Sequence, residues 1–254
     1  MEVETGKALD KSEVHDLLWV YGEDLREALS APGCTQAIDA AARAARRNRE
    51  NSRPGNIPWE NTLVGQLLVP VLHDTIGRTL RIDHEQARSL VFSENRASRK
   101  THAAPFSPSR SLSHPFGKGI GADVATIATS WRTTDKKKVG LAPACPDFAL
   151  GQPYGVVFEA KYYRPQNGNV EAARRALVEG IYQAFFYRAL PLAPAKKSGA
   201  PPWHYQYAAF VAVDTSPGHA LLQAWQELRN DVKTSFWDSA NIFVLIRAPG
   251  SSCP

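Results

Sequence analysis

Apolar residues recur every three or four positions through the first third of the chain, which is the spacing of amphipathic helices that turn one face to a core. The pattern predicts four helices, over residues 11–29, 36–48 and 55–77 and from about Asp83 to Phe92. Ser12 is the expected N-cap of the first helix. Pro70 is expected to kink the third helix, and Gly77 to end it.

The second half of the chain alternates between strand-like and helix-like segments. Strands are rich in β-branched and aromatic residues, whereas the intervening helices have apolar residues at helical spacing. The expected strands cover residues 122–132, 146–150, 155–163, 205–215 and 241–248, and the expected helices cover 170–190 and 218–232. This order predicts an α/β fold with a mixed central sheet flanked by helices.

A segment without periodicity separates these two parts. Residues 94–121 are rich in Ser, Pro, His, Gly and basic residues. Long irregular segments inside compact domains usually carry function. We therefore expect an N-terminal helical extension over residues 1–55 and a core over residues 56–254, with this basic insertion at about residues 94–121.

The charge distribution favours an anionic partner. The chain has 254 residues, a formal net charge of +5 and a pI near 9.1. Basic residues gather in separate segments, each of which alone is typical of a solvated face, and together they make contacts with the phosphates of nucleic acid an equal alternative. The candidate contacts are Arg96, Arg99, Lys100, Arg110, Lys118, Lys136, Lys137 and Lys138.

Composition excludes several other classes. No apolar run reaches the length of a membrane span, and the first residues are too acidic and polar for a secretory signal, so we expect a cytoplasmic protein with no membrane partner. The three cysteines are too few for an iron–sulfur cluster and too widely separated for a zinc-type pair. Any metal chemistry should therefore use oxygen ligands.

Charged residues interrupt the apolar segment "CPDFALGQPYGVVFEAKYY". Side chains alternate along a strand, so Glu159 and Lys161 share one face. Asp147 would come beside Glu159 if the two strands pair through the "GQPYG" turn. Adjacent carboxylates repel each other, and a divalent cation that prefers oxygen ligands removes this cost.

This arrangement suits the hydrolysis of a phosphodiester. Mg²⁺, with Mn²⁺ as a substitute, would be held by Asp147, Glu159 and the carbonyl of Ala160, and would lower the pKa of a bound water. Lys161 would orient that water or help to deprotonate it, and would stabilise charge on the transition state. The alternative is a same-face ion pair between Glu159 and Lys161 on a half-exposed strand.

With its flanking residues the segment resembles the PD-(D/E)xK nuclease superfamily. The resemblance is carried by "PD" at Pro146 and Asp147 and by "EAK" at residues 159–161, and it covers roughly the C-terminal half. It implies a restriction-endonuclease-like fold in which residues 56–254 form the nuclease core. By this likeness Asp147 and Glu159 are metal ligands and Lys161 is the catalytic lysine.

Such folds often add a carboxylate from the helix that precedes the sheet. Glu60 is the candidate, because it lies on one helical stripe with Val64, Leu67 and Val71 and so points inward. The alternative explanation is a first-turn acid that is favoured by the helix dipole. The competing acids are Asp74, Glu85 and Asp123.

The helix after "EAK" contains "QAFFY", in which Gln183 and Tyr187 lie four residues apart on one face, with Glu179 one turn earlier. This is similar to the Q-x-x-x-Y element of RecB-like members of the superfamily. In those members the element lines the active site and helps to hold nucleic acid. We therefore add Gln183 and Tyr187 to the expected catalytic site.

The favoured function is a Mg²⁺-dependent deoxyribonuclease of the restriction type, which would act as a homodimer on a short palindrome. The Gln183 and Tyr187 pair favours instead a RecB-like exonuclease or a repair or recombination nuclease. A non-catalytic nucleic-acid-binding module with the same fold is an alternative of another class, and an unrelated α/β protein is a third.

Overall fold

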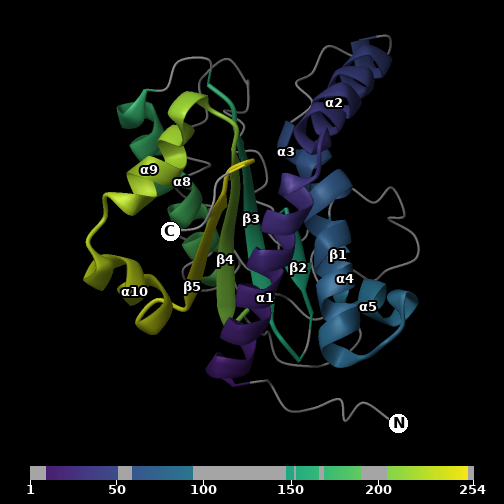
Figure 1. Ribbon diagram of the computed structural model, residues 1–254. Coiled ribbons are helices and arrows are strands. Elements are labelled where there is room, and N and C mark those ends of the chain that lie inside the picture. The colour runs from purple at the N-terminus through teal and green to yellow at the C-terminus, as the bar shows by residue number, and fades with distance from the viewer. Residues whose placement is uncertain are drawn as a thin grey trace, which may run out of the picture.

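A computed structural model describes residues 10–50, 59–93, 147–151, 153–165, 169–189 and 205–250. The described strands form one mixed sheet of five strands, in which β1 and β3 each pair antiparallel with β2, and β3–β5 run parallel (Figure 1). In spatial order they are β1 (Val91–Ser93), β2 (Phe148–Leu150), β3 (Val156–Tyr163), β4 (Tyr207–Asp214) and β5 (Ile242–Arg247). The predicted α/β class and mixed sheet are confirmed.

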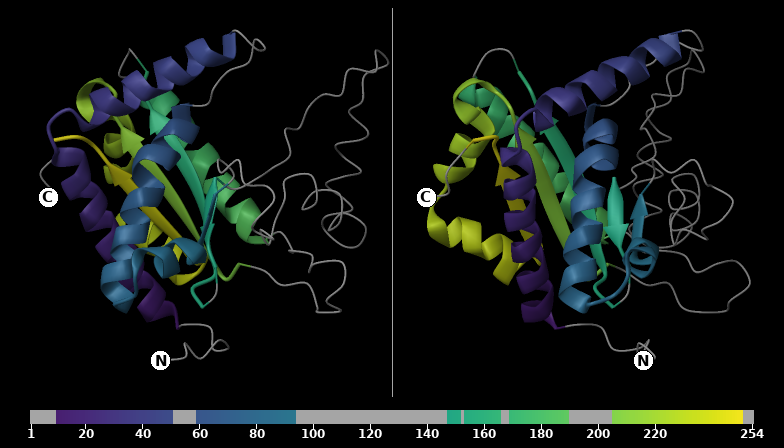
Figure 2. Two further views of the ribbon diagram at one scale, coloured as in Figure 1. Left: turned by 90° about the vertical axis from the view of Figure 1, so that its right-hand side faces the viewer. Right: turned by 45° about the vertical axis from the view of Figure 1, so that its right-hand side comes forward.

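Helices cover both faces of the sheet (Figure 2). On one face α1 (Lys11–Ser30) and α4 (Val69–Leu80) share a core with the sheet, and on the other α8 (Val170–Ala189) and α9 (Ala220–Gln226) share a second core. The other described helices are α2 (Cys34–Glu50), α3 (Trp59–Leu63), α5 (His84–Leu90), α10 (Asn230–Asp238), the π-helical η1 (Val64–Leu68) and the 3₁₀-helical η3 (Pro217–His219).

β4 lies between the two cores, because every one of its residues is buried. Its side chains alternate, so that Val211 belongs to the core under α1 and Phe210 to the core under α8. Gly180 on α8 lies directly over Phe210: a Cβ at this position would be 2.1 Å from Cε2 of the ring. The glycine therefore allows α8 to approach the sheet closely.

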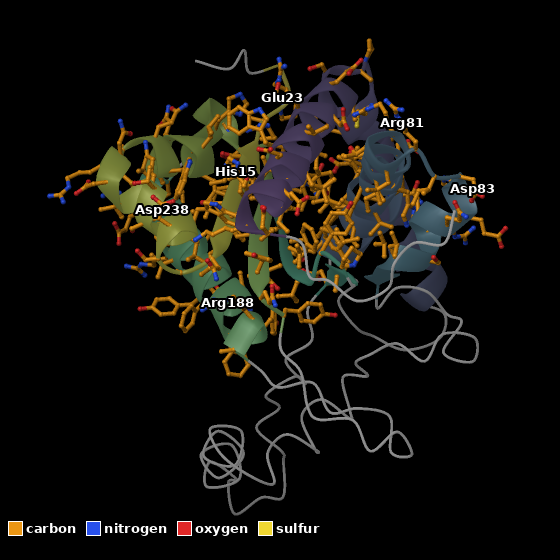
Figure 3. The ribbon with its side chains drawn as sticks, turned by 90° about the horizontal axis from the view of Figure 1, so that it is seen from below. His15, Glu23, Arg81, Asp83, Arg188 and Asp238 are labelled. Atoms are coloured by element: carbon orange, nitrogen blue, oxygen red, sulfur yellow. The ribbon has the colours of Figure 1, made fainter. Side chains whose placement is uncertain are left out.

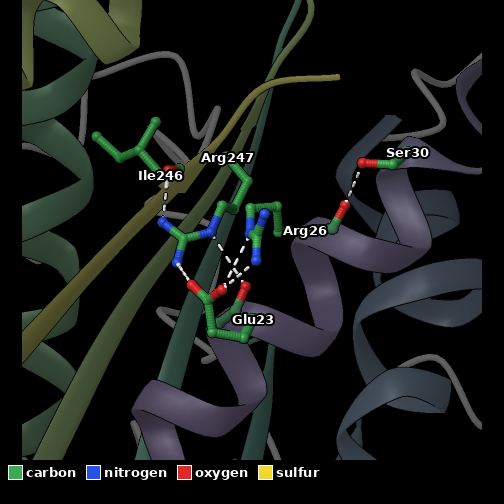
Figure 4. Close-up of polar contacts among 6 residues, drawn as sticks. Glu23, Arg26, Ser30, Ile246 and Arg247 are labelled. Atoms are coloured by element: carbon green, nitrogen blue, oxygen red, sulfur yellow. Dashed lines mark hydrogen bonds and ion pairs between the residues drawn. The ribbon is translucent and has the colours of Figure 1, made fainter. Parts of the chain in front are cut away.

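The first helix is fastened to the last strand. The Arg247 guanidinium on β5 donates through Nε to the Gly22 carbonyl at 3.0 Å, and Nη2 reaches Oε1 of Glu23 at 3.2 Å (Figure 4). Gly22 also allows close packing, because a Cβ there would be 2.8 Å from Cδ1 of Leu245. Residues 11–30, which belong to the predicted N-terminal extension, thus share one hydrophobic core with the sheet.

Two details predicted for the first and third helices are wrong. The N-cap of α1 is Asp10 and not Ser12, because Asp10 and Glu13 exchange side-chain-to-backbone hydrogen bonds at 2.9 Å in a capping box. The helical segment with Pro70 continues to Leu80 rather than ending at Gly77. Gly77 instead accommodates the chain that turns back after Arg81, since its Cβ position would be 3.4 Å from the Ile82 carbonyl oxygen.

The irregularity expected at Pro70 takes the form of the π-helical segment η1 that precedes it. At the end of η1 the Val69 N–H bonds to the Val64 carbonyl, five residues back. A proline has no N–H to offer to the helix ladder, so a local change of hydrogen bonding next to it is expected. The chain therefore forms one continuous helical segment, of α and π type, from Trp59 to Leu80.

Two further boundaries differ from the prediction. The fourth helix begins after Asp83 as expected but ends at Leu90, and the next residues form β1, which pairs Val91 with Leu150. The helix predicted over 218–232 is divided, because Arg229 is extended between α9 and α10. Packing of the Trp225 ring against Phe236, with centroids 5.9 Å apart, stabilises that bend. The predicted strand over 122–132 lies outside the described residues.

Candidate active site

A hairpin brings Asp147 beside Glu159. β2 and β3 pair antiparallel with Phe148 opposite Phe158, and Asp147 lies at the end of this ladder, directly before Phe148 and beside Glu159. The Asp147 amide donates to the Phe158 carbonyl at 3.1 Å. The charge of Asp147 also acts on the Glu159 carboxyl, so the two carboxyl groups are neighbours. The pairing expected from the sequence is confirmed.

The turn of this hairpin is closed by its own backbone. The amides of Tyr154 and Gly155 both donate to the Gly151 carbonyl, at 3.0 and 3.1 Å. Gly155 has a φ of 60°, which a glycine adopts without the strain that a Cβ would add. The turn thus sets the register that aligns the two carboxylates.

The Asp147 carboxylate is held in place by the backbone of β3. Its Oδ2 accepts a hydrogen bond of 2.7 Å from the Ala160 amide. β2 has ended at this level, so the amide lies free of the strand ladder and points to the side chain instead. Ala160 therefore contributes to the site through its backbone, which orients Asp147.

Glu159 is buried in a position that disfavours a negative charge. Only 7% of it is exposed, and burial, followed by the charge of Asp147, raises the pKa of its carboxyl to about 9. Lys161 lowers this pKa, whereas Glu60 and Glu179 raise it further. Four acids from three separate parts of the chain thus act on one another at this point of the sheet.

Glu60 reaches the site from α3. Its Oε1 lies 3.8 Å from Nζ of Lys161, and the two side chains are 29% and 22% exposed. Glu60 is therefore directed towards β3 as expected, and it forms an ion pair with the lysine. Of the competing acids, Asp74 and Glu85 are exposed, and Asp123 lies outside the described residues.

Arg164, just beyond β3, explains how α3 is positioned. Its guanidinium lies 4.0 Å from the centre of the Trp59 ring, and its Nη2 is 2.8 Å from Oδ2 of Asp39 on α2. Tyr162 donates to the other oxygen of Asp39 at 2.9 Å. Because Trp59 directly precedes Glu60, the stacked guanidinium fixes the helical turn from which Glu60 projects.

α8 lies over the opposite side of the site. Gln183 has its Oε1 enclosed by protein, without a hydrogen-bond partner in the part of the chain that the structure describes. Tyr187 is buried one turn later. A buried acceptor without a partner costs stability, so its retention favours a function for Gln183 over a purely structural role.

Sequence reasoning did not include Glu179 or Arg164 among the site residues. The spacing of four residues already put Glu179 on the helix face of Gln183, but no role was assigned to it from the sequence. No local signal joins Arg164 to Trp59, because the contact depends on how β3 and α3 meet. The eight basic residues expected to contact nucleic acid all lie outside the described residues.

The donor set fits a hard divalent cation in its chemistry. Asp147, Glu159 and Glu60 offer only oxygen atoms, and a cation among them would offset the repulsion that raises the pKa of Glu159. Within the described ranges, however, no three His, Cys, Asp or Glu side chains are already gathered as a ligand set. Asp147 is bound to the Ala160 amide and Glu60 lies beside Lys161, so ligation would require these side chains to exchange partners.

Family models and curated proteins do not identify the chain. No protein-family model matches the chain, and no curated protein matches it significantly. None of the described helices has both the length and the apolar character needed to cross a membrane. The case for a function depends on the residues of the site.

Proposed function

We propose that the chain is a Mg²⁺-dependent nuclease that hydrolyses DNA phosphodiester bonds, in the manner of a restriction-type endonuclease. The observation that supports this most is the position of Asp147 beside Glu159 at the end of the paired strands, with Lys161 two residues further along β3. A structural ion pair would need one acid and one base. Here a second carboxylate has been brought to a buried one, at a cost in electrostatic energy.

The chain's own residues would perform the following roles. Lys161 would bind the scissile phosphate, orient the attacking water and stabilise the negative charge that develops on the phosphate oxygens. Glu60, which lies beside Nζ of Lys161, would hold that ammonium group in position. The Ala160 amide would keep the Asp147 carboxylate facing the site.

Asp147, Glu159 and Glu60 would hold the cation through their carboxylates. Bound Mg²⁺ would supply a Lewis acid for the phosphate and a water of lowered pKa. The buried carboxyl of Glu159 would lose its proton when the cation binds, because a positive charge replaces the repulsion from Asp147. Mn²⁺ would serve as a substitute, since it accepts the same oxygen donors.

A RecB-like exonuclease is the second candidate. It is favoured by one observation: the enclosed and unpartnered Oε1 of Gln183 on the helix whose Glu179 raises the pKa of Glu159. An amide with an unused acceptor beside a catalytic cluster is suited to bind a substrate or a metal-bound water. Base recognition would then be unnecessary, and cleavage would begin at ends.

Incubation of the purified protein with supercoiled plasmid and with linear phage DNA, in Mg²⁺ or in EDTA, tests the proposal. Lys161→Ala should reduce cleavage by at least about 100-fold. Lys233→Ala is the matched control, because among the described residues Nζ of Lys233 bonds to the Gln226 carbonyl on the outer helices and not to the site. Its activity should equal that of the parent.

The products separate the candidates. Discrete bands that require Mg²⁺ and Lys161 indicate a restriction-type endonuclease, whereas gradual loss of linear DNA with intact circles indicates an exonuclease. If circular and linear DNA both remain intact but are retarded in a gel, a binding module replaces the nuclease. Cleavage that survives Lys161→Ala would mean that the hairpin is not the active site.

A further inference from the structure

α8 carries an apolar stripe that faces solvent. Five large apolar side chains are exposed in the described part of the chain, and three of them lie within two turns of this helix. They are Val178, Tyr182 and Phe185, with 52%, 69% and 44% of their surface exposed. Their spacing of four and three residues places them on one face, which we call the α8 stripe.

The α8 stripe points away from the core. The buried side of the same helix is formed by Leu177, Ile181 and Ala184, which pack against the sheet. A helix that served only to cover the sheet would have polar residues on its outer face. The exposed apolar residues of the stripe therefore require an explanation other than packing within the chain.

The α8 stripe shares its helix with two residues of the candidate active site. Glu179 and Gln183 each follow a stripe residue by one position, so their side chains lie about 100° around the helix from the stripe. Glu179 lies close enough to Glu159 to raise the pKa of that carboxyl. A strand held at Glu159 and Lys161 would hence reach the stripe by crossing the outer side of α8.

The chemistry of the α8 stripe suits flat, electron-rich groups attached to a negatively charged chain. Two of its residues, Tyr182 and Phe185, are aromatic. They are three positions apart, so about 4.5 Å separates them along the helix axis. The Arg188 guanidinium lies 5.4 Å from the centre of the Phe185 ring, and its Nε is enclosed without a hydrogen-bond partner among the described residues. Figure 3 shows Arg188 across the sheet from Glu23 and Arg81.

A second copy of the chain fits the α8 stripe less well. Three side chains of this size expose at most a few hundred Å², whereas a stable dimer buries roughly 800 Å² on each partner. The stripe is also flanked by charged residues, including Glu179 and Arg175. A narrow stripe of two rings with a nearby guanidinium is sufficient for bases, because each base presents one flat face.

We propose that Tyr182 and Phe185 stack on unpaired bases of the substrate strand, with Arg188 contacting the adjoining phosphate. This inference rests on the proposed function for the identity of the ligand, and it defines the substrate class as single-stranded DNA or the frayed end of a duplex. Paired bases inside an intact duplex offer no free face to the rings. Within the proposed nuclease activity, the α8 stripe thus favours the second candidate, which acts at ends, over a restriction-type endonuclease that recognises an internal palindrome.

Binding without cleavage tests the proposal. Fluorescence anisotropy in EDTA would compare oligothymidylate of about 20 nucleotides, which exceeds the usual site size of single-strand binders, with a blunt duplex hairpin of similar length. Replacing both rings in Tyr182→Ala/Phe185→Ala should weaken binding of oligothymidylate by about 10-fold or more, because stacking on an aromatic ring contributes substantially to the binding of each base. Duplex affinity should change by less than about 2-fold.

Two further variants make the test specific to the rings. Tyr182→Leu/Phe185→Leu keeps an apolar surface and a good helix former, and should lose the same affinity. Val178→Ala removes apolar area from the same stripe without removing a ring, and should bind like the parent. Unchanged affinity in both double variants, or an equal loss in Val178→Ala, would overturn the proposal.

The outcome is separable from that of the nuclease proposal. A chain that cuts plasmid but binds oligothymidylate equally with and without the rings retains the proposed function and loses this inference. If the chain never cuts DNA, but replacing the rings weakens its binding of oligothymidylate, the inference stands and the proposed function is wrong. If sedimentation shows a dimer that the double alanine variant dissociates, a second copy covers the α8 stripe and the inference is wrong.

Discussion

Nζ of Lys161 on β3 lies 3.8 Å from Oε1 of Glu60 on α3. The two side chains are 22% and 29% exposed, so the pair is open to solvent on one side. Ion pairs of this kind contribute about 0–1 kcal/mol. A substrate phosphate or a cation can therefore separate them at little cost, and Glu60 is suited to hold the lysine before substrate arrives.

The contact between Glu60 and Lys161 predicts a difference between two acids that have the same place in a helix. Glu60 and Glu85 both lie in a first turn, of α3 and α5, where a carboxylate interacts favourably with the helix dipole. Glu60→Gln should lower plasmid cleavage by about 10-fold or more, because it removes the partner of Lys161 and one oxygen ligand. Glu85→Gln should cleave like the parent.

Initial rates over a series of Mg²⁺ concentrations would measure this effect, with the midpoint of thermal unfolding recorded for both variants. A dipole effect alone predicts similar and small losses of stability in the two variants, of about 0.3–1 kcal/mol, and no change in rate. Equal rates for Glu60→Gln and Glu85→Gln would remove Glu60 from the active site.

Glu159 predicts an unusual dependence of stability on pH in the absence of a cation. Burial, and then Asp147, raises the pKa of this carboxyl to about 9 in the folded chain, whereas in the unfolded chain it titrates near its ordinary value of 4.5. The folded state thus binds one proton more between these values. Stability from this group is complete below pH 4.5 and is lost as the pH rises towards 9.

Thermal unfolding in EDTA at a series of pH values between 5 and 9 would reveal this loss. Glu159→Gln should flatten the decline, because a glutamine remains neutral throughout. Mg²⁺ should raise the midpoint of unfolding of the parent more at pH 9 than at pH 5, and should not raise that of Glu159→Gln. A parent and a variant with parallel pH profiles would contradict the raised pKa, to which Glu60 and Glu179 also contribute and which Lys161 lowers.

Much of this site could be predicted from the sequence, because its central part is local. The side chains of a strand alternate, so Glu159 and Lys161 had to share a face, and a short turn between two apolar segments made the pairing of Asp147 with Glu159 predictable. The inward orientation of Glu60 followed from a helical stripe. Each of these inferences needed only the period of one element and the length of one turn.

Other features depended on contacts that no periodicity encodes. β1 is only three residues long, and its apolar residues continue the pattern of the preceding helix, so a strand there could not be distinguished from a last helical turn. The break at Arg229 is stabilised by Trp225 and Phe236, which meet only after the chain has turned. The stacking of Arg164 on Trp59 likewise requires two elements to be docked first.

Gly180 predicts a loss of both stability and activity. An alanine Cβ at this position would lie 2.1 Å from Cε2 of Phe210, so α8 would have to move away from β4. Gly180→Ala should cost about 1–3 kcal/mol of unfolding free energy, which corresponds to a fall of about 3–10 °C in Tm. Cleavage should fall as well, because Glu179 and Gln183 move with the helix.

Gly65→Ala is the matched control for Gly180→Ala, since a Cβ at Gly65 meets no atom within 4 Å. It should leave Tm unchanged or slightly higher, because alanine is the better helix former. Phe210→Leu introduced into Gly180→Ala should recover part of the lost stability by making room for the methyl group. A Gly180→Ala variant as stable as the parent would mean that α8 does not pack on β4 this closely.

Gln183 allows function and stability to be separated. Its Oε1 is enclosed and has no hydrogen-bond partner among the described residues, and an unsatisfied buried acceptor costs about 1–3 kcal/mol. Gln183→Met keeps the length and helix propensity of the side chain while it removes both polar atoms. Stability should therefore stay equal or rise, whereas cleavage should fall by about 10-fold because the amide no longer contacts substrate or its bound water.

Gln223→Met, at an exposed position on α9, should change neither quantity. A Gln183→Met variant that loses stability but cleaves at the parent rate would make Gln183 a structural residue and would remove the main support for the RecB-like alternative.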